Sequence, residues 1–198
     1  MITTQDILAQ ICQREAEFEK TAEISLLGHS LFDLWQHTED YPHHFAGKIL
    51  ANLGFSAITA RQYLDWIVET GKITQLGKKV FIFLGVNDIV REPDYSPQEV
   101  ANWLEILVQK LKEIAPHSQY FLLEVTPVRW RDNLDNQPIQ QLNRYLKSHC
   151  PIGVTWIETY TAFCDENGLL AQELTTDGLH FSAQGYTLLA RLLQPYWQ

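Results

Sequence analysis

The sequence has few basic residues, few cysteines and no repeat or linker. Its 198 residues include 15 Lys and Arg against 24 Asp and Glu, which gives a formal net charge of −9. Binding to a phosphate backbone requires clustered Lys and Arg, so this charge balance argues against a nucleic-acid partner. Cys12, Cys150 and Cys164 form neither a CxxC pair nor an even set. We interpret them as buried or incidental thiols, with a catalytic cysteine as the weaker alternative.

The sequence also has no apolar stretch that approaches the length of a membrane span. The segment 1–6 has neither the basic start nor the apolar run of a secretory signal. We therefore expect a soluble, cytoplasmic protein without integral membrane association. An oligomer is compatible with the sequence.

The order of apolar and amphipathic segments predicts an α/β protein. At 45% hydrophobic content, residues 1–198 suffice for one well-buried domain. Short apolar runs alternate with helical patterns, as in a parallel sheet that is covered on both faces, so we predict a three-layer α/β/α sandwich. The expected strands are 23–27, about 51–54, 79–84, 119–125 and 153–157.

Capping patterns place the helices between these strands. Ser96-Pro97-Gln98-Glu99 combines an N-cap, a Pro at the first helical position and an acidic third position, and an apolar helical pattern follows it. Thr59-Ala60-Arg61-Gln62 is a second capping box, which opens a helix to about Thr70. Further helices are expected over about 4–19, 138–148 and 182–193. The first of these is expected on the flank of the sheet or against a second subunit.

Four segments place polar residues where this sheet would gather them. They are Gly28-His29-Ser30, Asn52-Leu53-Gly54, Gly85-Val86-Asn87-Asp88 and Asp177-Gly178-Leu179-His180. In open α/β sheets a ligand binds beyond the carboxyl ends of the strands, where the strand order reverses. If the order is 2-1-3-4-5, Ser30 and Asn87 follow the two strands that flank that reversal, and Gly54 follows the neighbouring strand. The loop before the last helix can fold over the same edge.

These residue types are those of a serine nucleophile with its base. The hydroxyl of Ser30 needs an imidazole to remove its proton during attack, and His180 is the candidate. Asp177 can accept from the other ring nitrogen and fix the tautomer. Taken alone, Ser30 would more often be structural, and Asp177 with His180 would more often be a capped turn. Their occurrence together reverses that balance.

An oxyanion formed during attack needs donors that are already in place. The backbone N–H groups of Ser30 and Gly54 and the side-chain amide of Asn87 are the predicted set. The alternatives are that Gly54 is a plain turn former and that Asn87 ends its strand in an Asx turn.

The four segments together resemble the four blocks of the SGNH (GDSL-type) hydrolases, and the resemblance spans nearly the whole chain. It implies a flavodoxin-like sandwich with a five-stranded parallel sheet and no metal or other cofactor. It also implies acyl-ester hydrolysis in which Ser30 attacks, His180 is the base, Asp177 orients it, and Gly54 and Asn87 join the Ser30 amide as oxyanion donors. Two positions depart from the family pattern: His29 replaces the usual Asp, and Ala57 replaces a second Gly.

Other residues are candidates for substrate contact. Phe32 and Trp35, one helical turn apart after Ser30, are candidates to line an acyl pocket. Arg129 and Trp130 follow the fourth strand and are as consistent with an exposed loop as with leaving-group contact. His29 either tunes the site or faces solvent, the second being slightly favoured. The His-rich stretch 37–44 matches no zinc spacing, so no metal is predicted.

The sequence therefore predicts a serine esterase that acts on small or medium acyl esters, such as an acylated sugar or lipid. An acyltransferase or thioesterase with the same triad is the first alternative. A non-catalytic binding module that keeps the fold is the second.

Overall fold

The fold is built on one sheet of five parallel strands, as predicted. The computed structural model describes residues 2–198. The strand order is β2-β1-β3-β4-β5, which is the expected 2-1-3-4-5. The strands are β1 Ile24–Gly28, β2 Leu50–Gly54, β3 Lys79–Phe83, β4 Gln119–Leu123 and β5 Val154–Ile157.

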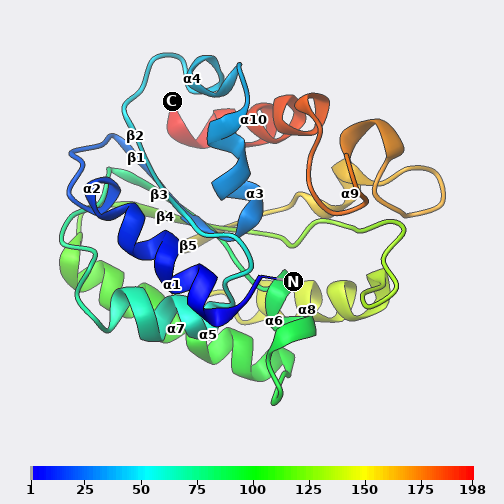
Figure 1. The fold of residues 1–198 in the computed structure, drawn as a ribbon, viewed down its shortest axis with the longest axis horizontal. Coiled ribbons are helices and arrows are strands. Elements are labelled where there is room, and N and C mark those ends of the chain that lie inside the picture. The colour runs from blue at the N-terminus through cyan, green and yellow to red at the C-terminus, as the bar shows by residue number, and fades with distance from the viewer. Residues whose placement is uncertain (1) are drawn as a thin grey trace.

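Helices cover both faces of this sheet (Figure 1). One face carries α1 Thr4–Gln13, α5 Ala60–Tyr63, the π-helical turn η2 Leu64–Val68, α7 Pro97–Ile114 and α8 Asn136–Ser148. The other carries α3 Ser30–Asp33, the 3₁₀ turn η1 Leu34–His37 and α10 Ala183–Trp197. Shorter elements are α2 Glu15–Phe18, α4 Tyr41–His44, α6 Val86–Arg91, α9 Tyr160–Phe163 and η3 Gln172–Leu174. The three-layer sandwich is thus confirmed.

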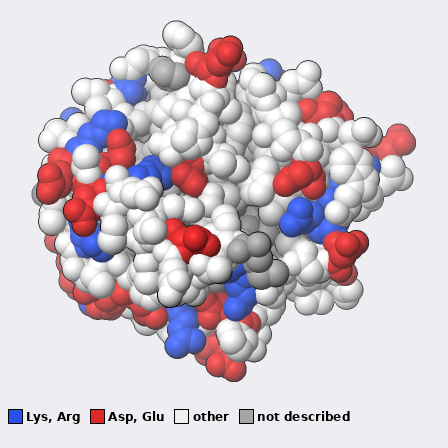
Figure 2. All heavy atoms as spheres, viewed as in Figure 1, with Lys and Arg blue, Asp and Glu red and all other residues white. Residues whose placement is uncertain are grey.

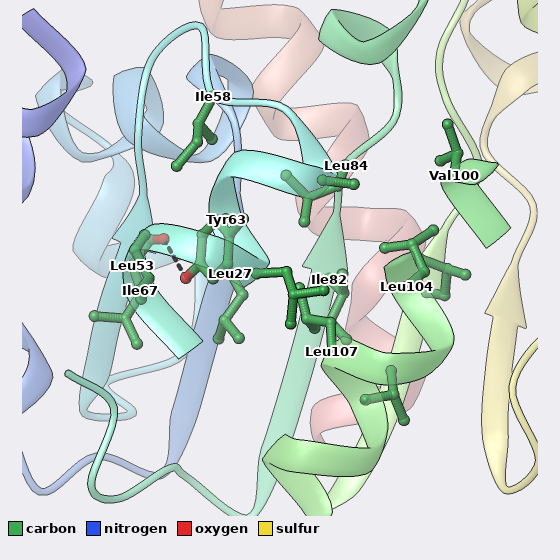
Figure 3. Close-up of a cluster of buried hydrophobic side chains, with 14 of the residues drawn as sticks. Leu27, Leu53, Ile58, Tyr63, Ile67, Ile82, Leu84, Val100, Leu104 and Leu107 are labelled. Carbon is green, nitrogen blue, oxygen red and sulfur yellow. Dashed lines mark hydrogen bonds between the residues drawn. The ribbon is translucent and has the colours of Figure 1, made fainter. Parts of the chain in front are cut away.

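Apolar side chains of the strands fill the space between the layers. Leu27, Leu53 and Ile82 from three adjacent strands meet α5 and α7 in the cluster drawn in Figure 3. The one buried hydroxyl in this view, that of Tyr63, donates to the carbonyl of Leu53 at 2.8 Å. Each fully buried aliphatic side chain of this kind stabilises the fold by roughly 1.5–3 kcal/mol. The cluster therefore fixes the carboxyl ends of β1, β2 and β3, from which the loops with Ser30, Ala57 and Asn87 start.

The predicted helix starts are present. Ser96 accepts from the Glu99 amide, and Thr59 and Gln62 form both bonds of a capping box. The helix expected over 4–19 is instead two helices that meet at Arg14. Arg14 leaves the helical conformation with φ −114° and ψ 26°. Ile7, Ile11 and Phe18 are buried in the core, so this segment packs on the sheet's flank.

The surface shows the mixed charge expected from the composition. On the face drawn in Figure 2, acidic and basic side chains are interspersed and form no continuous basic patch. None of the helices within residues 2–198 combines the length and apolar character needed to cross a membrane.

Candidate active site

The carboxyl ends of three central strands meet at one edge of the sheet. The register pairs Gly28 at the end of β1 with Gly54 on β2 and with Phe83 on β3. The chain segments that follow these three residues therefore start side by side. Ser30 is the first residue of α3, directly beyond this edge, and is 6% exposed.

The structure brings Ser30, His180 and Asp177 together. Ser30 Oγ lies 3.1 Å from His180 Nε2, across 150 positions of sequence. His180 Nδ1 lies 2.8 Å from Asp177 Oδ2. The other oxygen of Asp177 accepts from the backbone amides of His180 and Leu179 at 2.8 and 3.0 Å. This is the geometry in which an imidazole can take a proton from a hydroxyl while a carboxylate holds its far side.

Hydrogen bonding keeps the Asp177 carboxyl ionised. Its partial burial acts to raise the pKa, but the backbone and side-chain hydrogen bonds from His180 outweigh that effect and lower the pKa below its usual value. A carboxylate at this position favours the imidazolium that forms during attack.

A glycine fixes the turn that carries the base. Gly178 has φ +87°, and a Cβ there would lie 1.7 Å from the carbonyl oxygen of Arg129. The Arg129 amide donates to the carbonyl of Gly178 at 2.8 Å, and the Gly178 amide donates to Thr175 Oγ1 at 2.9 Å. Any side chain at Gly178 would separate these two loops and displace His180.

His29 is buried, so the slightly favoured prediction that it faces solvent is wrong. Its side chain caps α3: Nδ1 accepts from the Leu31 amide at 3.3 Å, and the ring lies 4.7 Å from that of Phe83. Burial and, to a smaller extent, the neighbouring His180 lower the pKa of His29 to about 3. A neutral imidazole thus lies beside Ser30, where the SGNH pattern that the sequence resembles usually has a carboxylate.

Gly54 does not present its amide as an unused donor. The Gly54 N–H donates to Asn52 Oδ1 at 3.0 Å inside the buried loop. The absent side chain is what the position requires, because a Cβ would lie 2.6 Å from the Asp33 nitrogen and 2.8 Å from Phe32 Cβ. Gly54 therefore allows α3 to pack against β2, a steric role that neither the donor nor the turn-former interpretation gave it.

Ala57 is the residue of this loop that sequence reasoning passed over as a donor. It has φ 66° and is half-buried, while its neighbours Ser56 and Ile58 are buried. Within the described part of the chain, neither the Ala57 nor the Ser30 amide has a hydrogen-bond acceptor. Asn87 Nδ2 donates to the Ile58 carbonyl at 2.9 Å, which places the Asn87 amide against this same loop. The replacement of the second family glycine by Ala57 was the signal in the sequence that could have drawn attention to this position as a donor.

A charged network behind Ser30 was also missed. Asp33, at the end of α3, accepts from Arg14 Nη1 at 2.8 Å and from the Ser56 hydroxyl and amide at 2.5 and 3.2 Å. Arg14 also donates to the carbonyls of Gly54, at 2.5 Å, and Asn52. The break between α1 and α2 thus puts a guanidinium where it joins α3 to the loop after β2. No spacing rule in the sequence links Arg14 to Asp33.

The acyl pocket predicted from Phe32 and Trp35 is wrong. Both side chains have no exposed surface and belong to the aromatic core between the sheet and α10, where Trp35 stacks on Tyr186. Trp35 Nε1 donates to His44 Nδ1 at 2.9 Å. The helical spacing of these residues indicates a helix face that is covered by other residues. Sequence alone does not show whether that face packs in the core or lines a pocket.

Arg129 and Trp130 lie beside the site but differ in their surroundings. The Arg129 guanidinium is occupied by an ion pair with Asp165 and a 2.6 Å bond to the Leu170 carbonyl, so its contacts are structural. Trp130 is 62% exposed with φ 55°. The residues described in the structure contain no cluster of three or more His, Cys, Asp or Glu side chains able to hold a metal ion.

Comparison with known proteins shows the family to which the chain belongs. Residues 26–188 match the model of the GDSL-like Lipase/Acylhydrolase family. The chain belongs to this family. Membership of this family supports a hydrolase of the esterase or lipase kind.

The chain is similar to several known proteins and solved structures. N-acylneuraminate cytidylyltransferase of Escherichia coli is 35% identical over 189 residues, which cover 93% of this chain but 42% of that protein. Platelet-activating factor acetylhydrolase IB subunit alpha2 of Homo sapiens is 24% identical, over 88% of this chain and 76% of that protein. A GDSL-like lipase structure from Bacteroides thetaiotaomicron has a TM-score of 0.74 at 22% identity and covers 96% of this chain and 98% of its own. The last likeness concerns the fold.

Proposed function

We propose that the chain is a serine esterase that forms an acyl-enzyme on Ser30. The observation that carries this proposal is the 3.1 Å separation of Ser30 Oγ from His180 Nε2, with Asp177 at 2.8 Å on the other ring nitrogen. A hydroxyl, an imidazole and a carboxylate in this order are the groups of a nucleophile activated by a general base.

In the first half of the reaction, Ser30 Oγ attacks the carbonyl carbon of the ester while its proton passes to His180 Nε2. The tetrahedral intermediate then collapses: the bond to the alcohol oxygen breaks, and His180 returns the proton to that leaving oxygen. In the second half, His180 takes a proton from water, the resulting hydroxide attacks the acyl-Ser30 carbonyl, and the Ser30 oxygen leaves with the proton. The products are an alcohol and a carboxylic acid.

The oxyanion of each tetrahedral intermediate needs donors near Ser30. We infer that the amides of Ser30 and Ala57 and the side chain of Asn87 supply them. The two backbone amides are unoccupied within residues 2–198, and Asn87 Nδ2 keeps its second hydrogen after bonding the Ile58 carbonyl. This set retains two of the predicted donors and replaces Gly54 by Ala57, because the Gly54 amide is already bonded to Asn52.

Short acyl esters are the substrates to test first. Ser30 is 6% exposed, and the aromatic residues expected to form an acyl pocket lie in the core instead. The name of platelet-activating factor acetylhydrolase also points to an acetyl group. The name of the cytidylyltransferase relative suggests cytidylyl transfer as a different activity, but this chain spans less than half of that protein. Ester hydrolysis accounts for the assembled site and cytidylyl transfer does not.

Fluorophosphonate labelling of the folded protein, followed by intact mass and peptide mapping, tests the proposal. One label on Ser30 is expected, with none in Ser30→Ala and normal labelling in Ser148→Ala, which removes an exposed hydroxyl on α8. Absence of the label from Ser30 in folded protein contradicts the mechanism. Loss of acetyl-ester turnover in Ser30→Ala, with turnover in the wild type, excludes the non-catalytic module.

Product analysis in the presence of added alcohols, sugars or thiols separates the hydrolase from an acyltransferase. A free carboxylic acid as the main product supports hydrolysis. Transfer of the acyl group to the added acceptor, in preference to water, would instead support the alternative on the same triad.

A further inference from the structure

A cavity of about 220 Å³ lies beside the candidate active site. Asn87, a proposed oxyanion donor, and Leu179, which precedes the base His180, belong to its wall. The cavity is lined by Val86, Asn87, Val90, Arg91, Arg131, Asn133, Leu134 and Leu179. Asn87 and Leu179 place this wall of the cavity beside the candidate active site.

Two arginines contribute the charge in this cavity. Neither Arg91 nor Arg131 forms an ion pair with a carboxylate within residues 2–198. In contrast, the arginines that brace the site are paired: Arg14 with Asp33 and Arg129 with Asp165. The cavity is thus lined by two arginines whose charge is not neutralised by a carboxylate within residues 2–198.

The environment of Arg91 strengthens this point. Its Nη2 donates to the carbonyl of Ile2 at 3.3 Å, while its Nε is buried and has no hydrogen-bond partner in the described structure. A buried donor without an acceptor is costly, because it has lost water and gained nothing in return. An acceptor supplied by a ligand would remove that cost.

The rest of the lining suits an anion as well. The side chains of Val86, Val90 and Leu134 form apolar walls, and no Asp or Glu lies among the described residues that line the cavity. Apolar walls lower the local dielectric constant and so strengthen the attraction between a guanidinium and an anion. Asn87 and Asn133 add amide groups that can donate hydrogen bonds.

We propose that this cavity binds an anionic group, a carboxylate or a phosphate, carried by the alcohol part of the substrate ester. The leaving alcohol must lie within reach of His180, because the imidazole returns the proton to it. The cavity is on the side of Leu179, next to that base, so it receives the leaving group rather than the acyl group. This inference rests on the proposed function and adds a substrate class to it.

Matched acetyl esters test the charge preference in the intact protein. The three substrates are meta-acetoxybenzoate, meta-acetoxyphenyl phosphate and the neutral meta-acetoxybenzamide. The measured quantity is kcat/KM of each anionic ester divided by that of the neutral ester, since intrinsic reactivity cancels when proteins are compared. The two anionic arms separate a carboxylate site from a phosphate site.

The ratio should fall by about 10- to 100-fold in Arg131→Gln, as expected for loss of a charge-assisted hydrogen bond. Arg91→Gln should act in the same direction, and Arg131→Glu should bring the ratio below that of Arg131→Gln. Arg191→Gln, which removes an exposed arginine from α10, should keep the wild-type ratio. High salt should lower the wild-type ratio by screening. A ratio that is the same in wild type and in the cavity variants overturns the proposal.

A binding measurement keeps this test independent of catalysis. Calorimetry on Ser30→Ala should show tighter binding of meta-hydroxybenzoate or meta-hydroxyphenyl phosphate than of meta-hydroxybenzamide, and Arg131→Gln in that background should remove the difference. Equal binding of anionic and neutral ligands rejects the anion site even if esters are hydrolysed. Absence of all ester turnover together with selective anion binding rejects the proposed function and retains the site.

Discussion

Replacement of Arg14 by Met is expected to lower both stability and activity, although Arg14 does not contact Ser30. Arg14 and Asp33 are only 16% and 13% exposed, and Arg14 also serves the carbonyls of Gly54 and Asn52. Met keeps much of the volume of the Arg side chain but removes every one of these donors. The Asp33 carboxylate would then retain the bonds from Ser56 and a 3.2 Å bond from the Gln36 side-chain amide.

The expected loss of stability follows from this burial. Removal of one partner of a fully buried ion pair costs about 3–5 kcal/mol, and charged hydrogen bonds are worth about 1.5–3 kcal/mol each. Because water retains slight access to both groups, we expect the lower end of that range, about 3 kcal/mol. For a protein of this size, that corresponds to a decrease in Tm of about 6–12 °C. Urea unfolding and a thermal melt measure the two quantities.

The kinetic effect should lie mainly in kcat. Arg14 and Asp33 hold α3 against the loop that carries Ala57, so their loss loosens the nucleophile relative to a proposed oxyanion donor. A misplacement of about 1 Å can cost roughly 100-fold in rate, and we expect kcat for a neutral acetyl ester to fall by about 10- to 100-fold. KM should change less than kcat.

A double-mutant cycle and a control decide whether this reasoning holds. Asp33→Asn combined with Arg14→Met should show a coupling energy of about 1–3 kcal/mol. Arg144→Met, which removes an exposed arginine from α8, should change stability by less than about 0.5 kcal/mol. A destabilisation by Arg14→Met no larger than that of the control, or additive effects of the two changes, would refute the network's role.

Four further predictions concern the site and its surroundings. Asp177→Asn should reduce kcat by roughly 10³–10⁴ with little change in KM, whereas Asp132→Asn on an exposed loop should not; a loss below about tenfold would speak against the orienting role. Asn87→Ala should reduce kcat by roughly 10²–10³, and an unchanged kcat would remove it from the oxyanion site. Burial lowers the pKa of His29 to about 3, so only the unfolded chain gains this proton between about pH 6.5 and pH 3, and stability falls as pH drops through that window. His29→Asn, which can still accept from Leu31, should make stability less dependent on pH there. Burial raises the pKa of Asp88 to about 7, so its contribution falls by about 2–4 kcal/mol as pH rises from about 4 to 7. Asp88→Asn should remove this decline, because its amide oxygen can still accept from Ala60.

Urea unfolding at a series of pH values checks the last two predictions. The two variants should change the pH dependence in opposite directions. Burial keeps His29 neutral by disfavouring its protonation, whereas it keeps Asp88 neutral by disfavouring its deprotonation. Curves of His29→Asn and Asp88→Asn that parallel the wild type would contradict both assignments.

Much of the fold was predictable because burial imposes simple patterns on the sequence. The apolar runs of 79–84 and 119–125 contain β3 and β4, and each overshoots its strand by one or two residues at the carboxyl end. Ser96 and Thr59 marked helix starts because their side chains satisfy amides that a helix leaves unbonded. The sheet has the common strand order that the sequence analysis assumed, and Ser30 and His180 meet beyond its edge as that order implied.

The errors arose where a residue's partner lies far away in the sequence. Phe32 and Trp35 have the spacing of a helix face, but only packing shows that the face meets α10 and not a substrate. Gly54 was predicted as an oxyanion donor or a turn former, but its amide is bonded to Asn52 and its missing side chain makes room for α3. Arg14 is separated from Gly54 by 40 positions, and no local pattern records that contact.

The distance of 150 positions between Ser30 and His180 also governs when chemistry can begin. Consider a folding chain in which the sheet and α3 have formed but α10 and Arg129 do not yet hold the 174–182 segment in place. In that chain no imidazole lies beside Ser30, and its hydroxyl is unreactive. On the proposed mechanism, the appearance of ester turnover during refolding would mark the docking of the segment that carries His180 rather than the collapse of the core. On the same mechanism, a cut in the 164–176 connection that released α10 would separate His180 from Ser30 and abolish turnover.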